Sequence, residues 1–133
     1  MSTSPITVAR ALYAALEQGQ HGAALRSHFT PDAYTLEQPN RLKPRGMRAE
    51  LAQMLEASSA GAGLLAECRY AVRSAIEVND TAIVRLLWTG TVARDVGNLR
   101  EGQVLTAHIA QFIETRDGKI RSIETYDCYE PFE

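Results

Sequence analysis

The second half of the chain alternates between apolar and polar residues, and this alternation limits the fold more than any other feature. In the stretch AECRYAVRSAIEV, which ends at Val78, one side carries Cys68, Tyr70, Val72, Ile76 and Val78, and the other carries Glu67, Arg69, Arg73 and Glu77. A period of two is typical of a β-strand with one buried face. Turn residues at Asn79-Asp80 and Asp117-Gly118 join such stretches. The sequence therefore predicts a meander of long antiparallel strands.

The first half has helical spacing instead. Ser4-Pro5 is typical of a helix start, because serine can cap free amide groups and proline suits the first helical position. A helix that ends at Gly19 would bury Ile6, Ala9, Leu12, Tyr13 and Leu16. A short helix is expected over 22–29, closed by Thr30-Pro31-Asp32, and a short strand over 33–39. The apolar face of a third helix would hold Met47, Leu51, Met54 and Leu55. Helices followed by strands predict one α+β domain over 1–133.

Composition and motifs exclude several classes of function. The net charge of -2 and the pI of about 5.9 argue against nucleic-acid binding. There is no apolar run of membrane-helix length and no signal-peptide pattern, so we expect a cytoplasmic protein with reduced Cys68 and Cys128. The histidines and cysteines lie far apart, so no metal or other cofactor is expected. The absence of a glycine-rich phosphate loop and of GxSxG argues against phosphoryl transfer, nucleotide binding and covalent hydrolysis.

The strand expected over 104–115 carries apolar residues on both faces. One face holds Leu105, Ala107, Ile109 and Ile113, and the other holds Thr106, His108, Ala110 and Phe112. A sheet that covers only its own core should be polar on one side. We therefore expect the helix-free face, which would also carry Arg73 and Arg85, to be buried in a twofold homodimer. Ordinary exposed apolar residues are the alternative.

The order of these elements resembles the NTF2-like superfamily, in particular its SnoaL-like and ketosteroid-isomerase-like branches. The matching stretches are LYAALEQGQHGAALRSHFTPDA, WTGT, IAQFIETRDGKI and YDCYEPF, and the resemblance covers essentially the whole chain. It implies a cone-shaped fold, in which three N-terminal helices cover the concave face of a curved antiparallel sheet around an apolar pocket. The superfamily hosts isomerases, cyclases, dehydratases, hydrolases and many non-catalytic members, so the fold alone does not define the function.

The resemblance also implies site residues. His108 falls where ketosteroid isomerases carry the protonated acid of their oxyanion hole, and Tyr13 falls where they have the tyrosine that shares this task. Asp127 matches an acid/base aspartate of SnoaL-like polyketide cyclases, in which a histidine lies close by, so a pair with His108 across the hairpin is expected. For the isomerase base, an ungapped count gives Glu37, whereas the LEQP pattern gives Gln38, which cannot take a proton. The pocket would be lined by Tyr34, Met54, Tyr70, Leu86, Trp88, Phe112 and Ile123.

Two functions are compatible with these residues. The first is a cofactor-independent isomerase, cyclase or dehydratase acting on a small apolar carbonyl compound such as a steroid or polyketide. In it, Tyr13 and His108 would stabilise charge on oxygen, and Asp127 or Glu37 would move the proton. The second is a non-catalytic small-molecule-binding or dimerisation module. There, His108 would be a structural histidine bonded to Asp127 or Tyr13, and Asp127 would tether the C-terminal tail.

Overall fold

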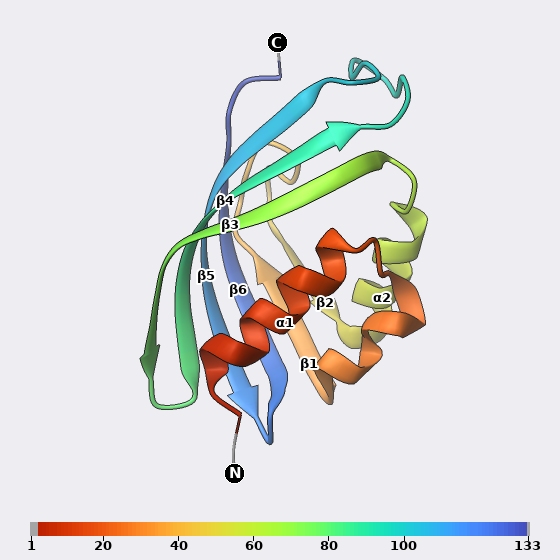
Figure 1. Ribbon diagram of the computed structural model, residues 1–133. Coiled ribbons are helices and arrows are strands. Elements are labelled where there is room, and N and C mark those ends of the chain that lie inside the picture. Colours follow the sequence, from red (N-terminus) through yellow and green to blue (C-terminus); the bar gives the residue numbers. More distant parts are fainter. Residues whose placement is uncertain (1–2, 133) are drawn as a thin grey trace.

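The computed structural model describes residues 3–132, which form a curved six-stranded sheet and three helices (Figure 1). The helices are α1 (Pro5–Glu17), the 3-10 helix η1 (Gly22–His28) and α2 (Leu51–Ala60). The strands are β1 (Phe29–Glu37), β2 (Met47–Glu50), β3 (Leu65–Val78), β4 (Thr81–Val92), β5 (Val104–Arg116) and β6 (Lys119–Tyr129). Their order in the sheet is β2-β1-β6-β5-β4-β3. Neighbours are antiparallel except β1 and β6, which are parallel, so the sheet is mixed rather than wholly antiparallel.

Helix α1 lies across the face of the sheet that we call concave, and it packs against β3, β4, β5 and β6. Ser4 caps its first turn by accepting a hydrogen bond from the amide of Thr7, as the Ser-Pro start predicts. Its buried side includes Val8, Ala9 and Leu12. Helices η1 and α2 pack on each other and on β1, and η1 also contacts α1 and β6. The expected α+β class is therefore confirmed, whereas three N-terminal helices over the concave face are not, since α2 follows β1 and β2.

Two element boundaries differ from those expected. Strand β1 begins at Phe29, so the segment 30–32, expected to close the short helix, already belongs to the sheet. Met47 lies in β2 rather than on a helix, and α2 begins only at Leu51. The start of α2 is fixed by a capping box. The side chain of Glu50 accepts a hydrogen bond from the backbone amide of Gln53, and the side chain of Gln53 accepts one from the backbone amide of Glu50.

An irregularity in β3 changes which residues face the core. The pairing of β3 with β4 shifts between Val72 and Ser74, as a β-bulge does. Beyond this shift Ala75 packs against the core, while Ile76 and Val78 are exposed by 58% and 52%. The expectation that Ile76 and Val78 share a face with Tyr70 is therefore wrong, because one extra residue reverses the direction of the side chains that follow.

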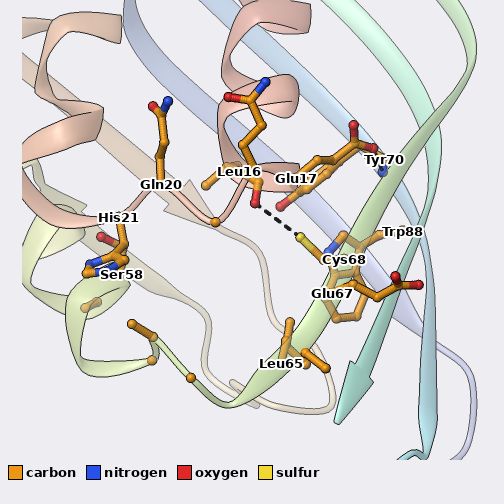
Figure 2. A pocket seen from close by; sticks show the side chains of 17 residues that line it. Leu16, Glu17, Gln20, His21, Ser58, Leu65, Glu67, Cys68, Tyr70 and Trp88 are labelled. Carbon is orange, nitrogen blue, oxygen red and sulfur yellow. Dashed lines mark hydrogen bonds between the residues drawn. The ribbon is translucent and has the colours of Figure 1, made fainter. Parts of the chain in front are cut away.

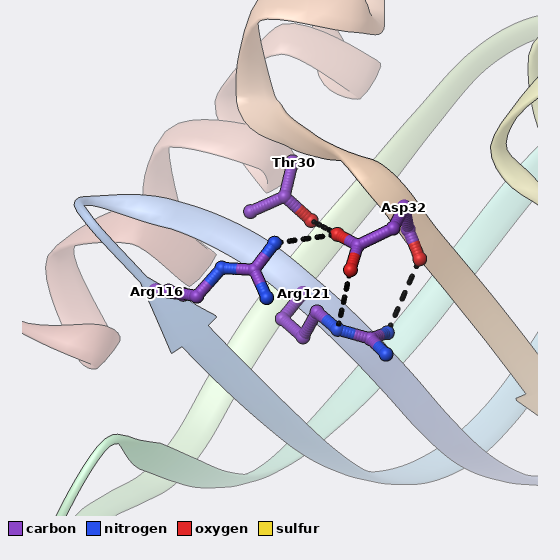
Figure 3. Close-up of polar contacts among 4 residues, drawn as sticks. All are labelled: Thr30, Asp32, Arg116 and Arg121. Atoms are coloured by element: carbon purple, nitrogen blue, oxygen red, sulfur yellow. Dashed lines mark hydrogen bonds and ion pairs between the residues drawn. The ribbon is translucent and has the colours of Figure 1, made fainter.

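Asp32 links β1 to the hairpin between β5 and β6 (Figure 3). Its carboxylate accepts a hydrogen bond from Arg116 at 2.6 Å and lies 3.3 Å from Nε of Arg121. The hydroxyl of Thr30 donates to the same carboxylate at 2.8 Å. The hydrogen bond from Arg116 is the main reason why the pKa of Asp32 lies below its ordinary value.

The outer face of the sheet, opposite the concave face, carries exposed apolar side chains. Phe112 and Tyr126 are exposed by 39% and 43%, and their rings meet edge-on at 6.0 Å. Ile76 and Val78 extend this exposed apolar surface, which we call the outer patch. Within residues 3–132, no helix is long and apolar enough to cross a membrane.

Candidate active site

A cleft of about 530 Å³ opens between the C-terminal ends of α1 and α2 and the beginning of β3 (Figure 2). Its rim is polar and includes Glu17, His21 and Glu67. Tyr70 of β3 and Trp88 of β4 also line it, and these two residues pair across the strands. The cleft therefore combines aromatic walls with a charged rim, as small-molecule sites often do.

Gly90 gives the Trp88 ring its place in this wall. A Cβ atom on Gly90 would lie 2.6 Å from Cη2 and 2.7 Å from Cζ2 of the indole, closer than real Cβ contacts come. Because glycine has no side chain, the indole can lie against the backbone of β4. The WTGT stretch therefore shapes the cleft as well as the strand.

Tyr13 connects the cleft wall to the interior. Its ring stacks on Tyr70 with centroids 5.0 Å apart, and only 4% of Tyr13 is exposed. Burial raises the pKa of both phenols well above the ordinary value, so both are neutral. The hydroxyl of Tyr13 donates to Oε1 of Gln111 at 2.7 Å, so its proton already has an acceptor within the protein.

From Gln111 the hydrogen bonds continue to Asp127. Nε2 of Gln111 donates to Oγ1 of Thr125 at 3.1 Å, and the Thr125 hydroxyl donates to Oδ1 of Asp127 at 2.5 Å. The alternation of β5 and β6 places Gln111, Thr125 and Asp127 on the concave side. Four residues from three elements thus form one continuous series of hydrogen bonds, which we call the Tyr13–Asp127 chain.

Asp127 is a half-buried carboxylic acid whose pKa is raised above its ordinary value. Burial is the main cause, the hydrogen bond from Thr125 opposes it, and the nearby charge of Glu37 adds to it. In the described part of the chain Asp127 forms no ion pair. It also contributes to the raised pKa of Tyr70 in the cleft wall. A carboxylate in this environment can accept and return a proton more readily than an exposed one.

Glu37, and not Gln38, lies on the concave side of the sheet. Glu37 pairs with Thr125 in the sheet and is close enough to raise the pKa values of Asp127 and Tyr129, so it faces the concave side. Its Oε2 accepts a hydrogen bond from Asn40 at 2.7 Å. Gln38 instead donates to Glu124 at 2.7 Å. Glu37, the residue that the ungapped count from Tyr13 gives, is therefore the one on the concave side.

His108 lies on the outer face, and the expected pair with Asp127 is wrong. His108 is directly opposite Cys128, whereas Asp127 is opposite Ile109, and residues one position apart in a strand point to opposite faces. The His108 side chain is 57% exposed, and its Nε2 lies 2.8 Å from Oε2 of Glu130. The structure thus separates His108 from Tyr13 and Asp127.

The expected pocket-lining residues fall into three groups. Tyr70 and Trp88 line the cleft. Leu86 and Ile123 are packed core residues, and Met54 is half-buried against the same core. Tyr34 and Phe112 are not in a pocket on the concave side, because Tyr34 packs under the guanidinium groups of Arg48 and Arg121 and Phe112 belongs to the outer patch.

Three polar residues of the concave side were not among the expected site residues: Gln111, Thr125 and Tyr129. Tyr129 meets Trp88 edge-on at 6.3 Å, and burial raises its pKa to about 12. Gln111 and Thr125 could have been found by asking which polar residues share the buried face of their strand with Ile109 and Ile123.

The Cys68 thiol is not activated as a nucleophile, and the described residues hold no metal cluster. The Cys68 thiol donates to the carbonyl of Leu16 at 3.5 Å, and burial together with Glu17 and Glu67 raises its pKa. A thiol with a raised pKa is a poor nucleophile. Over residues 3–132, no group of three or more His, Cys, Asp or Glu side chains could hold a metal ion.

A curved six-stranded sheet with α1 across its concave face is the arrangement of an NTF2-like fold. The chain belongs to the SnoaL-like domain family, whose model matches residues 9–123. No curated protein matches its sequence.

Solved structures agree on the fold. IdmH from Streptomyces antibioticus, a proposed polyketide cyclase, is 19% identical with a TM-score of 0.77, over 94% of this chain and 92% of that one. TerC, co-crystallised with polyporic acid, is 21% identical with a TM-score of 0.72, over 94% and 92%. A protein of ketosteroid-isomerase-like fold from Catenulispora acidiphila, in complex with trimethylamine, is 17% identical with a TM-score of 0.69, over 93% and 86%.

Proposed function

We propose that this protein is a cofactor-independent acid/base enzyme of the isomerase, cyclase or dehydratase type. Its substrate would be a small, largely apolar carbonyl compound of steroid or polyketide class. The observation that carries the proposal is Asp127, a half-buried carboxylate without an ion-pair partner in the described residues. It lies on the concave side, outside the lining of the cleft but close enough to Tyr70 of the cleft wall to raise the pKa of that phenol. Membership of the SnoaL-like family and the likeness to a proposed polyketide cyclase support it.

In this proposal Asp127 removes a proton from carbon next to the substrate carbonyl and returns it to another atom. Oδ1 of Asp127 accepts the hydrogen bond from Thr125, which leaves Oδ2 as the proton acceptor. Tyr70 and Trp88 would hold the apolar body of the substrate. Glu37 would act through its charge, which raises the pKa of Asp127. Tyr13 would not donate to the substrate, because its proton is bound to Gln111.

The test is exchange of carbon-bound protons with solvent. A panel of steroid-like and polyketide-like ketones would be incubated with the protein in D2O, and loss of the proton signal next to the carbonyl would be followed by NMR. We expect Asp127→Asn to abolish exchange with the melting temperature preserved. His108→Ala is the matched control and should retain exchange, since His108 lies on the outer face. Exchange that survives Asp127→Asn would refute the role of Asp127.

A second candidate function is a non-catalytic small-molecule-binding module. The observation that favours it is that Tyr13 donates its hydrogen bond to Gln111 and that His108 lies on the outer face. The expected pair of donors for a substrate oxygen, Tyr13 and His108, is therefore not assembled. Quenching of Trp88 fluorescence by members of the same panel, without proton exchange by any of them, would favour this function.

We also propose that the outer patch is buried in a homodimer. Exposed apolar residues at Ile76, Val78, Phe112 and Tyr126 support this proposal, since monomers seldom expose a contiguous apolar surface of this kind. A sedimentation-velocity measurement would test it, and a monomer at all protein concentrations would contradict it.

A further inference from the structure

The direction of the Tyr13–Asp127 chain depends on a residue that does not touch Asp127. Tyrosine and threonine hydroxyls can each donate or accept a hydrogen bond, and an amide can turn over to exchange its donor and acceptor. Such a chain can therefore run in either direction. Two groups determine the direction: the carboxylate of Asp127 at one end and the buried hydroxyl of Tyr13 at the other.

At the inner end, Tyr13 determines the direction of the hydrogen bonds in the Tyr13–Asp127 chain. Within residues 3–132 its hydroxyl bonds to Gln111 alone, and the residue is 4% exposed. If the Gln111 amide turned over, Nε2 would donate to the Tyr13 oxygen and the phenolic proton would have no acceptor. A buried donor without an acceptor is costly, so Gln111 keeps Oε1 toward Tyr13. Nε2 must then point to Thr125, which accepts this bond and directs its own proton to Asp127.

We propose that Tyr13, through Gln111 and Thr125, is a positioning residue that keeps a hydrogen bond on Oδ1 of Asp127 and thereby holds Oδ2 ready to accept a proton. The other titratable groups near Asp127 are Glu37 on β1, Tyr70 on β3 and Tyr129 on β6. Arg10 lies near Tyr13 on α1. None of these groups is hydrogen-bonded to a member of the chain in the described structure. The inference rests on the proposed role of Asp127, but its test needs no substrate.

The test is a titration of the Asp127 carboxyl carbon by 13C NMR, with the signal assigned from Asp127→Asn. Thr125→Val removes the direct donor and should raise the Asp127 pKa by about one to two units, the value of a hydrogen bond to a charged acceptor. Tyr13→Phe keeps the ring and its stacking, and should raise the pKa in the same direction by less. Tyr70→Phe is the matched control, since it alters the stacked partner outside the chain, and should leave the pKa close to that of the wild type.

The double variant Tyr13→Phe/Thr125→Val distinguishes the chain from a general effect of lost polarity. If Tyr13 acts through Thr125, its substitution adds nothing once Thr125 is valine. Equal effects of Tyr13→Phe in both backgrounds, or no effect in either, would overturn the inference. Gln111→Met interrupts the chain in the middle and should reproduce the Tyr13→Phe result. A chain confirmed by titration in a protein that exchanges no protons would refute the proposed function alone.

Discussion

The contact between Gly90 and Trp88 allows a prediction whose sign can be reversed by a second substitution. Gly90 is not among the glycines with positive φ, so alanine suits its backbone and Gly90→Ala changes only the packing. The new Cβ would lie 2.6 Å from the indole, and ordinary contact begins at 3.4 Å. The ring edge must therefore retreat by about 0.8 Å. Because the indole borders the cleft, it can move in that direction.

The magnitude follows from two opposing effects. Overpacking costs about 1–3 kcal/mol, and replacing glycine by alanine in a strand returns about 0.5–1 kcal/mol. We expect the free energy of unfolding to fall by about 1 kcal/mol, which lowers the melting temperature by roughly 3–5 °C in a domain of this size. Urea unfolding followed by circular dichroism would measure the loss. Trp88 is the only tryptophan in the chain, so its emission should move to longer wavelength as the ring enters the cleft.

The double variant Gly90→Ala/Trp88→Ala provides the control. Without the indole, the nearest remaining atom is Cδ1 of Leu65 at 3.1 Å, the end of a flexible side chain. Gly90→Ala should then stabilise the Trp88→Ala protein by about 0.5–1 kcal/mol. A Gly90→Ala protein as stable as the wild type with unchanged emission would refute the packing argument, as would the same loss in both backgrounds.

Four further predictions concern charge and surface. Because the folded pKa of Asp127 is raised, its charged form disfavours the native state, and the free energy of unfolding should fall as the pH rises through the folded pKa. Asp127→Asn should remove this fall and be more stable than the wild type at pH 7, as measured by urea unfolding across a pH series. The pH dependence that Asp32 contributes to the free energy of unfolding has the opposite sign. Because the folded pKa of Asp32 is lowered, its stabilising contribution is present at neutral pH and is lost as the pH falls through the folded pKa. Asp32→Asn should cost a small amount at pH 7 that disappears in acid and in high salt, since the pair is exposed; a larger cost in acid would contradict this. Phe112→Lys should yield a monomer in sedimentation velocity, with Arg69→Lys unchanged as a conservative control, and a persisting dimer would exclude the outer patch as the interface. His108→Ala should leave the Asp127 titration unchanged, and a shifted titration would show contact between groups that the structure places on opposite faces.

Much of the secondary structure was predictable from the sequence because its signals are local. Ser4-Pro5 starts a helix, and the turns at Asn79-Asp80 and Asp117-Gly118 join long strands, as expected. The bulge after Val72 was not predictable, since no glycine or proline marks it. Ser74 is the one polar residue in the apolar alternation, which resumes in the same phase at Ile76 and Val78. The parallel pairing of β1 with β6 joins segments far apart in the chain, and no local pattern specifies such a contact.

The candidate site was only partly predictable, for a reason that lies in β5. Both faces of this strand are largely apolar, so alternation defines two faces without saying which one the helices cover. The family resemblance was then used to assign the face of His108, and this assignment was wrong.

The polar residues on the buried face are a better criterion for finding the concave side. Tyr13 is buried on the helix stripe, and a buried hydroxyl needs a partner. The strand residue that can supply one on the same face as Ile109 and Ile113 is Gln111, and Gln111 faces Thr125 across the hairpin. Satisfying the hydrogen bonds of Tyr13 therefore leads from the helix to Asp127 and identifies the concave side, whereas His108, whose partner Glu130 is exposed, has no such connection.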